Sequence, residues 1–116
     1  MLKIDENNNI EITQGDNFSL PLIAYKDESR TEKYELQEGE SFVLSVRILA
    51  GGEPVIRKET TTHDSELGFS FDFSTADTAT LKRAEYIYDV ALINASGTLQ
   101  NTFLGGEEEK RTLKVV

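Results

Sequence analysis

The sequence contains no cysteine, no tryptophan and a single histidine, His63, among 116 residues. Without cysteine, the chain can form no disulfide framework, no thiolate nucleophile and no thiolate zinc site. One histidine also argues against zinc, because the metal usually takes several nitrogen or sulfur ligands. We therefore expect neither cysteine chemistry nor a zinc centre.

Long apolar runs are also absent. No segment approaches the roughly 18 consecutive apolar residues of a membrane span. The first residues, MLKIDENNNIEI, lack the apolar centre of a signal peptide. We expect a protein that is made in the cytoplasm, is not exported by a signal peptide and does not bind a membrane.

Basic residues are outnumbered, with 12 Lys and Arg against 21 Asp and Glu, which gives a net charge of −9. Nucleic acids and anionic membranes are bound by clustered Lys and Arg, so this balance argues against both as partners. It suits a soluble protein or one whose partner is basic. The length predicts a single domain over residues 1–116, in which the polar opening over residues 1–9 is a candidate flexible segment.

Apolar residues that alternate with polar ones dominate the rest of the chain. The clearest case places Leu67, Phe69, Phe71 and Phe73 on one face. The same period predicts strands over residues 10–14, 18–25, 41–49, 55–60, 67–73, 98–104 and 111–116.

Residues typical of turns indicate how these strands are connected. Gly51, Gly52 and Pro54 predict a hairpin between residues 41–49 and 55–60. In the first of these strands, Phe42, Leu44, Val46 and Ile48 are expected on one face. Pro21 cannot donate to a sheet ladder, so residues 18–25 should form an edge strand or begin a strand near this proline.

Residues 81–95, LKRAEYIYDVALINA, fit two patterns. A helical stripe can be drawn through Leu81, Ala84, Tyr88, Ala91, Leu92 and Ala95. The strand preference of Tyr86, Ile87, Tyr88 and Val90, and the surrounding period of two, favour a strand. Its alternation directs Tyr86, Tyr88, Val90 and Leu92 to the core and Asp89 to the outer face.

One short helical turn is expected over residues 74–81. Ser74 or Thr75 can cap it, and an acid follows in the first turn. Together, the segments predict an all-β fold, an antiparallel sandwich of about seven or eight strands with this one helical turn. The predicted core consists of Phe42, Leu44, Val46, Phe69, Phe71, Phe73, Tyr86, Tyr88, Val90 and Leu92.

Two groups of residues are candidates for a catalytic site. Asp89 would need a second titratable group beside it for catalysis, and a surface pair with Arg47, worth about 0–1 kcal/mol, explains it more simply. His63 adjoins Asp64 and Ser65, but neighbouring residues of an extended chain point to opposite faces and cannot form a relay.

Other residue types are weaker candidates. The acid-rich stretches 5–9 and 64–66 offer oxygens to calcium but match no calcium-loop spacing, and Gly51–Gly52 and Gly105–Gly106 lack a phosphate-loop context. Four tyrosines could stack on a sugar, yet most aromatics sit at core positions. We therefore expect no catalytic, metal or cofactor-binding residues.

Five segments carry a family resemblance in their order along the chain: ITQGDNFSLPL (12–22), SFVLSVR (41–47), FDFSTADTATL (71–81), AEYIYDVAL (84–92) and the strand pair 102–116. The set resembles the N-terminal domain of the baseplate upper protein family of phages and prophages of Gram-positive bacteria. The likeness covers nearly the whole chain from Ile10. It departs at Ala84, where the family usually has a turn glycine, and in the charged segment 26–33.

The resemblance implies an immunoglobulin-like sandwich that builds or decorates a tail or baseplate. Its partners would be other tail or baseplate proteins or further copies of itself, its location would be the virion, and it would carry no catalytic residues. Tyr86, Tyr88 and Asp89 would be scaffold residues, with tyrosine hydroxyls bonded to polar groups near a sheet end.

Two other functions stay open. A carbohydrate- or receptor-binding sandwich would expose a cluster of aromatic side chains on one sheet face. An enzyme would gather acids in a cleft, for which Asp72, Asp77 and Asp89 are the candidates.

The alternation in residues 67–73 can be tested by two substitutions. Phe71→Ala should lower the free energy of unfolding by about 3–5 kcal/mol because it removes a core ring. Asp72→Ala should change it little because Asp72 is expected to face solvent. Denaturant melts of both variants measure the difference, and equal losses would contradict the strand assignment.

Overall fold

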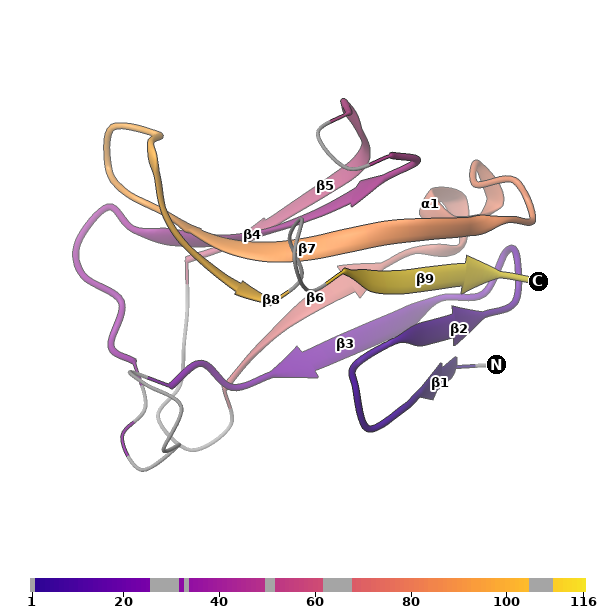
Figure 1. Cartoon of the computed structure of the whole chain (residues 1–116), viewed down its shortest axis with the longest axis horizontal. Helices are drawn as coiled ribbons and strands as arrows, with labels where there is room; N and C mark the ends of the chain where they lie inside the picture. The colour runs from indigo at the N-terminus through magenta and orange to yellow at the C-terminus, as the bar shows by residue number, and fades with distance from the viewer. Residues whose placement is uncertain (1, 26–31, 33, 50–51, 62–67, 105–109) are drawn as a thin grey trace.

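The computed structural model describes residues 2–25, 32, 34–49, 52–61, 68–104 and 110–116. The described residues form two facing sheets and one short helix (Figure 1). In chain order, the elements are β1 Leu2–Ile4, β2 Ile10–Ile12, β3 Phe18–Leu22, β4 Ser41–Arg47, β5 Pro54–Thr60, β6 Phe69–Phe73, α1 Thr75–Ala79, β7 Glu85–Ile93, β8 Leu99–Leu104 and β9 Arg111–Val115.

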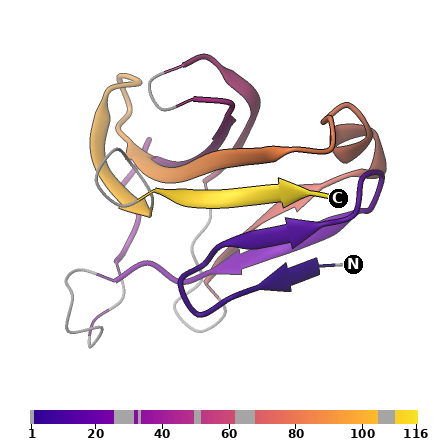
Figure 2. The same cartoon turned by 45° about the vertical axis from the view of Figure 1, so that its right-hand side comes forward.

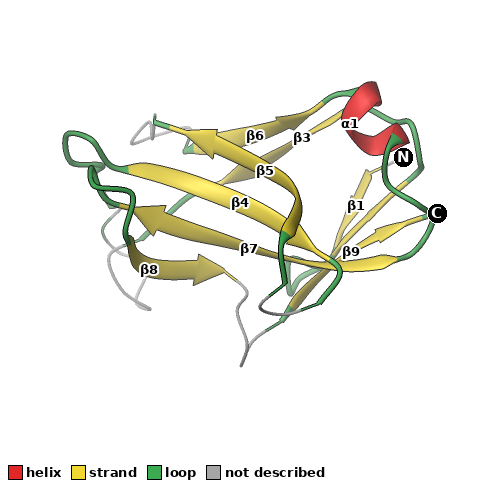
Figure 3. Ribbon diagram, turned by 90° about the horizontal axis from the view of Figure 1, so that it is seen from above, coloured by secondary structure: helices red, strands yellow, loops and turns green. Residues whose placement is uncertain are grey.

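The larger sheet contains seven strands in the order β1-β2-β9-β7-β4-β5, with β8 also paired to β7. The smaller sheet contains β3 and β6 alone. Strand β7 is the centre of the larger sheet, because β4 pairs along one side while β9 and β8 pair with the two halves of the other side (Figure 3). The all-β prediction with one short helix is therefore confirmed.

The expectation of a purely antiparallel sandwich is wrong at one position. Strands β2 and β9 run parallel, with Ile10 opposite Leu113 and Ile12 opposite Val115 (Figure 2). The other pairings are antiparallel among the residues that the structure describes. No turn connects β2 to β9, so turn residues could not reveal their relative direction.

The core lies between the two sheets. All ten predicted core residues are buried there, and none exposes more than 6% of its surface. Phe42 of β4 stacks on Phe69 of β6 across the sheets, with ring centroids 4.3 Å apart. Phe18 and Phe73 stack at 4.6 Å as a cross-strand pair within the smaller sheet. Along β6, buried phenylalanines alternate with exposed Ser70 and Asp72.

The β4–β5 hairpin forms as predicted, but one residue expected on the inner face of its first strand does not reach the core. Strand β4 ends at Arg47, and the register shift beside Val46 leaves Val55 as an extra residue on β5. Ile48 lies beyond the end of β4 and is 64% exposed. The expectation that Ile48 shares the inner face with Val46 is wrong, because the strand ends before this residue.

Residues 85–93 form a strand, so the helical alternative is wrong for them. At its start, the Tyr86 hydroxyl donates to the Lys82 carbonyl oxygen at 3.1 Å. The Tyr88 hydroxyl donates to the carbonyl oxygen of Asn8, and burial raises the pKa of Tyr88. Both tyrosines thus combine a buried ring with a satisfied hydroxyl, as a scaffold residue at a sheet end requires.

Helix α1 begins with the predicted cap. The Ser74 hydroxyl accepts from the Asp77 backbone N–H at 3.1 Å, and the Asp77 carboxylate accepts from the Ser74 N–H at 2.9 Å. This reciprocal pair is a capping box. Thr78, which is fully buried, donates its hydroxyl to the Asp16 carbonyl at 2.6 Å and so ties the helix to the turn before β3.

The alternation of apolar residues predicts no strand before Ile10, whereas the structure has β1 and a tight turn over residues 5–9. The Asp5 carboxylate accepts from the backbone N–H groups of Asn7 and Asn9 at 2.8 and 2.9 Å. These bonds lower the pKa of Asp5, with the Asn9 bond as the largest cause. The Asn9 side chain also accepts from the Thr112 N–H at 3.0 Å, which fixes the turn to β9.

This turn predicts an acid-sensitive contribution to stability. Because the pKa of Asp5 is lowered in the folded state, its contribution should be complete above about pH 4 and lost as the pH falls through the lowered value. Asp5→Ala should therefore be less stable than wild type at pH 7, and the difference should shrink below about pH 4.

Chemical denaturation across this pH range measures the effect. Glu6→Ala, which removes the neighbouring exposed acid, is the matched control and should not produce it. A gap between wild type and Asp5→Ala that is constant with pH would contradict the role of the carboxylate.

Candidate interaction site

The acid in the centre of β7 forms an ion pair on the outer face of the larger sheet. Asp89 lies opposite Ser45 of β4, and its carboxylate contacts the guanidinium of Arg47. The prediction that Asp89 faces outward and pairs with Arg47 is confirmed. The two side chains are only 24% and 23% exposed, respectively. Burial raises the pKa of Asp89, and the charge and hydrogen bond of Arg47 act in the opposite direction.

Arg47 also holds the end of the β4–β5 hairpin. Its Nε donates to the carbonyl oxygen of Gly52 at 2.8 Å, while the Gly52 N–H donates to the Leu49 carbonyl at 3.0 Å. The guanidinium therefore connects β7, through Asp89, to the chain that follows the turn. We refer to this arrangement as the Arg47 brace.

The brace supports an apolar surface that we call the hairpin tip, made of Ile48, Leu49, Gly52 and Val55. Leu49 is 71% exposed, Ile48 64% and Val55 45%, and the other exposed large apolar side chains of the described residues reach at most 40%. Exposed aliphatic residues are typical of a contact with another protein where they form a contiguous patch. The apolar alternation of the sequence could not have revealed this tip, because the alternation continues through Ile48 whereas β4 ends at Arg47.

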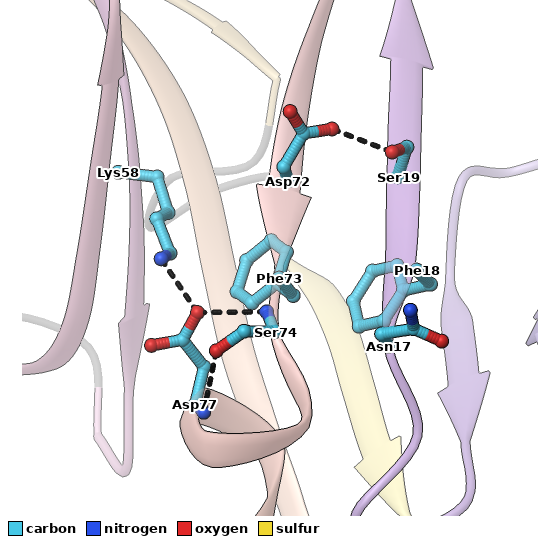
Figure 4. A pocket seen from close by; sticks show the side chains of 8 residues that line it. All are labelled: Asn17, Phe18, Ser19, Lys58, Asp72, Phe73, Ser74 and Asp77. Atoms are coloured by element: carbon cyan, nitrogen blue, oxygen red, sulfur yellow. Dashed lines mark hydrogen bonds and ion pairs between the residues drawn. The ribbon is translucent and has the colours of Figure 1, made fainter.

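A polar pocket of about 480 Å³ lies at the end of the smaller sheet, near α1 and β5 (Figure 4). The Lys58 ammonium donates to the Asp77 carboxylate at 2.6 Å and lies 5.6 Å from the centre of the Phe73 ring. The Lys58 bond is the largest cause of the lowered pKa of Asp77. Beside it, Ser19 donates to Asp72 at 2.5 Å across β3 and β6.

These contacts join elements of the fold. Lys58 from β5 reaches the helix cap at Asp77, and so closes the corner where β5 meets β6. Of the three acids named for a cleft, the pocket brings together Asp72 and Asp77, whereas Asp89 is not among its lining residues. Within the described ranges, no three His, Cys, Asp or Glu side chains are grouped to hold a metal ion.

Glu40, a buried acid that the sequence did not single out, is the centre of a second polar cluster. Glu40 is 8% exposed and accepts from the Tyr34 hydroxyl at 2.9 Å and from the Gln37 N–H at 2.7 Å. Burial, and then the hydrogen bond to Glu40, raises the pKa of Tyr34. The Tyr34 ring packs edge-on against Phe42 at 6.3 Å.

The described aromatic side chains do not form an exposed platform. Every phenylalanine and tyrosine whose burial is described is buried, apart from Tyr25 and Tyr34, which are half-buried. The remaining sequence candidates, His63, Asp64, Ser65, Glu66, Gly105 and Gly106, lie outside the described residues.

No protein-family model matches the chain, and neither a curated protein nor a solved structure matches it. Among the described helices, none is long and apolar enough to cross a membrane.

The Arg47 brace predicts a measurable coupling between its two charged side chains. A double-mutant cycle with Arg47→Ala and Asp89→Ala should give a coupling energy of about 1–2 kcal/mol, because both groups are largely shielded from water. The pair Arg57–Glu59, with side chains 53% and 47% exposed and 3.4 Å apart, is the matched control. Its cycle should give about 0–0.5 kcal/mol. Equal coupling energies in urea denaturation would contradict the shielding of the Asp89 pair.

Proposed function

We propose that this chain is a non-enzymatic structural or adaptor module of a phage or prophage tail or baseplate, with an immunoglobulin-like sandwich fold. It acts through contacts with other tail or baseplate proteins and is part of the virion. The ordered segments that resemble the baseplate upper protein family suggest this setting. The single observation that carries the mode of action is the hairpin tip, where Ile48 and Leu49 are 64% and 71% exposed.

The physical argument concerns preorganisation. A loop that must be ordered on binding loses conformational entropy, which weakens the complex. Arg47 reduces this loss because it already bonds to the Gly52 carbonyl on one side and to Asp89 on the other. Two aliphatic side chains on a fixed turn can then enter an apolar depression of a neighbouring protein, where buried anchors supply most of the binding energy.

The carbohydrate-binding alternative has less support. It requires an aromatic side chain with a ring face open to solvent. Phe18 and Phe73 line the pocket, but they are 9% and 2% exposed, and Lys58 lies over the second ring. Neither ring offers a face on which a sugar could stack.

The proposal can be tested by co-expression with the proteins of the neighbouring reading frames, followed by size-exclusion chromatography with light scattering. Wild type should co-elute with a tail protein. The double variant Ile48→Ser, Leu49→Ser should bind at least about tenfold more weakly, with little change in melting temperature because both residues are exposed.

Ile23→Ser provides the matched control, since it removes another exposed aliphatic side chain, 40% exposed, away from the hairpin tip. It should leave the complex intact. A strict monomer at high concentration that associates with none of the neighbouring tail proteins would overturn the proposal.

A further inference from the structure

The two sheets differ in width, and the larger one is incompletely covered at β1. Leu2 and Ile4 stand opposite Ile12 and Ile10 and share their inward face. Ile12 and Ile10 are 0% and 2% exposed, whereas Leu2 and Ile4 are both 38% exposed. A sheet of two strands spans only part of a face built from seven. The apolar inner face therefore continues beyond its cover along β1, at the edge of the sheet (Figures 1 and 2).

The backbone of β1 is also arranged to accept a strand. The Asp5 N–H donates to the Asn9 carbonyl at 3.0 Å, in line with the register that pairs Ile4 with Ile10 and Lys3 with Glu11. Hydrogen-bonded pairs alternate in an antiparallel ladder. The backbone N–H and C=O groups of Lys3 therefore point toward β2, whereas those of Leu2 and Ile4 point away from it. The Ile12 carbonyl, opposite Leu2, likewise points away from β1, because it accepts from the Val116 N–H beyond β9 at 2.9 Å.

The sheet edges at β3 and β5 are less receptive. Strand β3 contains Pro21, which has no N–H to donate and is typical of a protected edge. Strand β5 lies against β6, and Lys58 and Asp77 close that corner. Strand β1 has neither a proline nor such a neighbour within the described part of the chain.

We propose that β1 binds an extended segment of a basic partner protein by strand addition, with bonds to the backbone of Leu2 and Ile4. This proposal rests on the assembly function proposed above and names a second contact surface with the chemistry of its partner. Asp5, Glu6 and Glu11 lie on or beside the β1–β2 hairpin, and Lys3 is 4.0 Å from Glu11. The charge of this edge and the net charge of −9 favour a basic segment.

A second copy of the chain is a poorer occupant. Pairing β1 with itself would bring two chains of net charge −9 together. A basic segment carries the opposite charge and can place aliphatic side chains beside Leu2 and Ile4. Its residue opposite Lys3 must be uncharged, because like charges directly opposite each other destabilise a sheet.

Synthetic peptides test the proposal directly. The probe is the blocked heptapeptide KKVTVKK, whose threonine lies opposite Lys3 when its valines lie beside Leu2 and Ile4. Its controls are EEVTVEE, which reverses the charge, and KKPTVKK, which removes an N–H group of the added strand. Calorimetry at low salt should detect binding of KKVTVKK, and both controls should bind at least about tenfold more weakly. Rising salt concentration should weaken binding of the first peptide because it screens the charges.

Two variants locate the site. Ile4→Pro removes an N–H group that the β1–β2 ladder does not use and should weaken KKVTVKK binding about tenfold. Ile4→Ala shortens the same side chain but keeps the N–H, so it should bind more tightly than Ile4→Pro. Amide exchange by NMR gives a second measurement that needs no variant: the Leu2 and Ile4 amides should become protected when peptide is added, whereas Lys3 should be protected with and without it.

The outcomes separate this proposal from the assembly function. Peptide binding that leaves the Leu2 and Ile4 amides unprotected, or no binding, would overturn strand addition even if the tail proteins co-elute. Equal affinity for KKVTVKK and EEVTVEE would overturn the basic partner. A dimer of the chain that Ile4→Pro dissociates would overturn the basic partner in favour of a second copy. Loss of co-elution with tail proteins, together with peptide binding at Leu2 and Ile4, would overturn the assembly function and leave the strand-binding edge in place.

Discussion

The rings of Phe42 and Phe69 stack face to face at 4.3 Å, one from each sheet, and the rest of the structure is arranged around this contact. Phe71 meets Phe69 edge-on at 5.6 Å, and Phe18 with Phe73 extends the aromatic layer along the smaller sheet. Two strands can cover a wider sheet only where they bring enough apolar volume, and here large rings supply it. Where the rings end, the inner face of the larger sheet meets solvent.

Much of the fold could be predicted from the sequence, because its signals are local. The alternation in β6 follows from side chains that point to opposite faces in turn. The cap at Ser74 and Asp77 is a matter of spacing within one turn. Even the partner of Asp89 was identifiable, because β4 and β7 each carry a clear inner face and so fix which residues share the outer one.

The remaining features depend on interactions that sequence patterns do not encode. Strand β4 ends at Arg47 and leaves Ile48 outside the core, although the apolar alternation continues through Ile48 and does not mark this end. Glu40 is buried in a loop, and only the folded chain brings Tyr34 and Gln37 to its carboxylate. The same limit applies to the candidate site. Asp89 and Arg47 could be paired, but their role in supporting the hairpin tip depends on the Gly52 carbonyl.

The parallel pairing of β2 with β9 has a consequence for how the protein is made. The hydrogen bond between Thr112 and Asn9 joins residues 103 positions apart, and the β2–β9 ladder lies beside it. Contacts between distant residues slow folding, because a long loop must close before they form. A ribosome completes β1 and β2 long before it reaches β9. The first hairpin therefore emerges without the neighbour that holds it in the sheet, and it joins the fold only after β9 has been made.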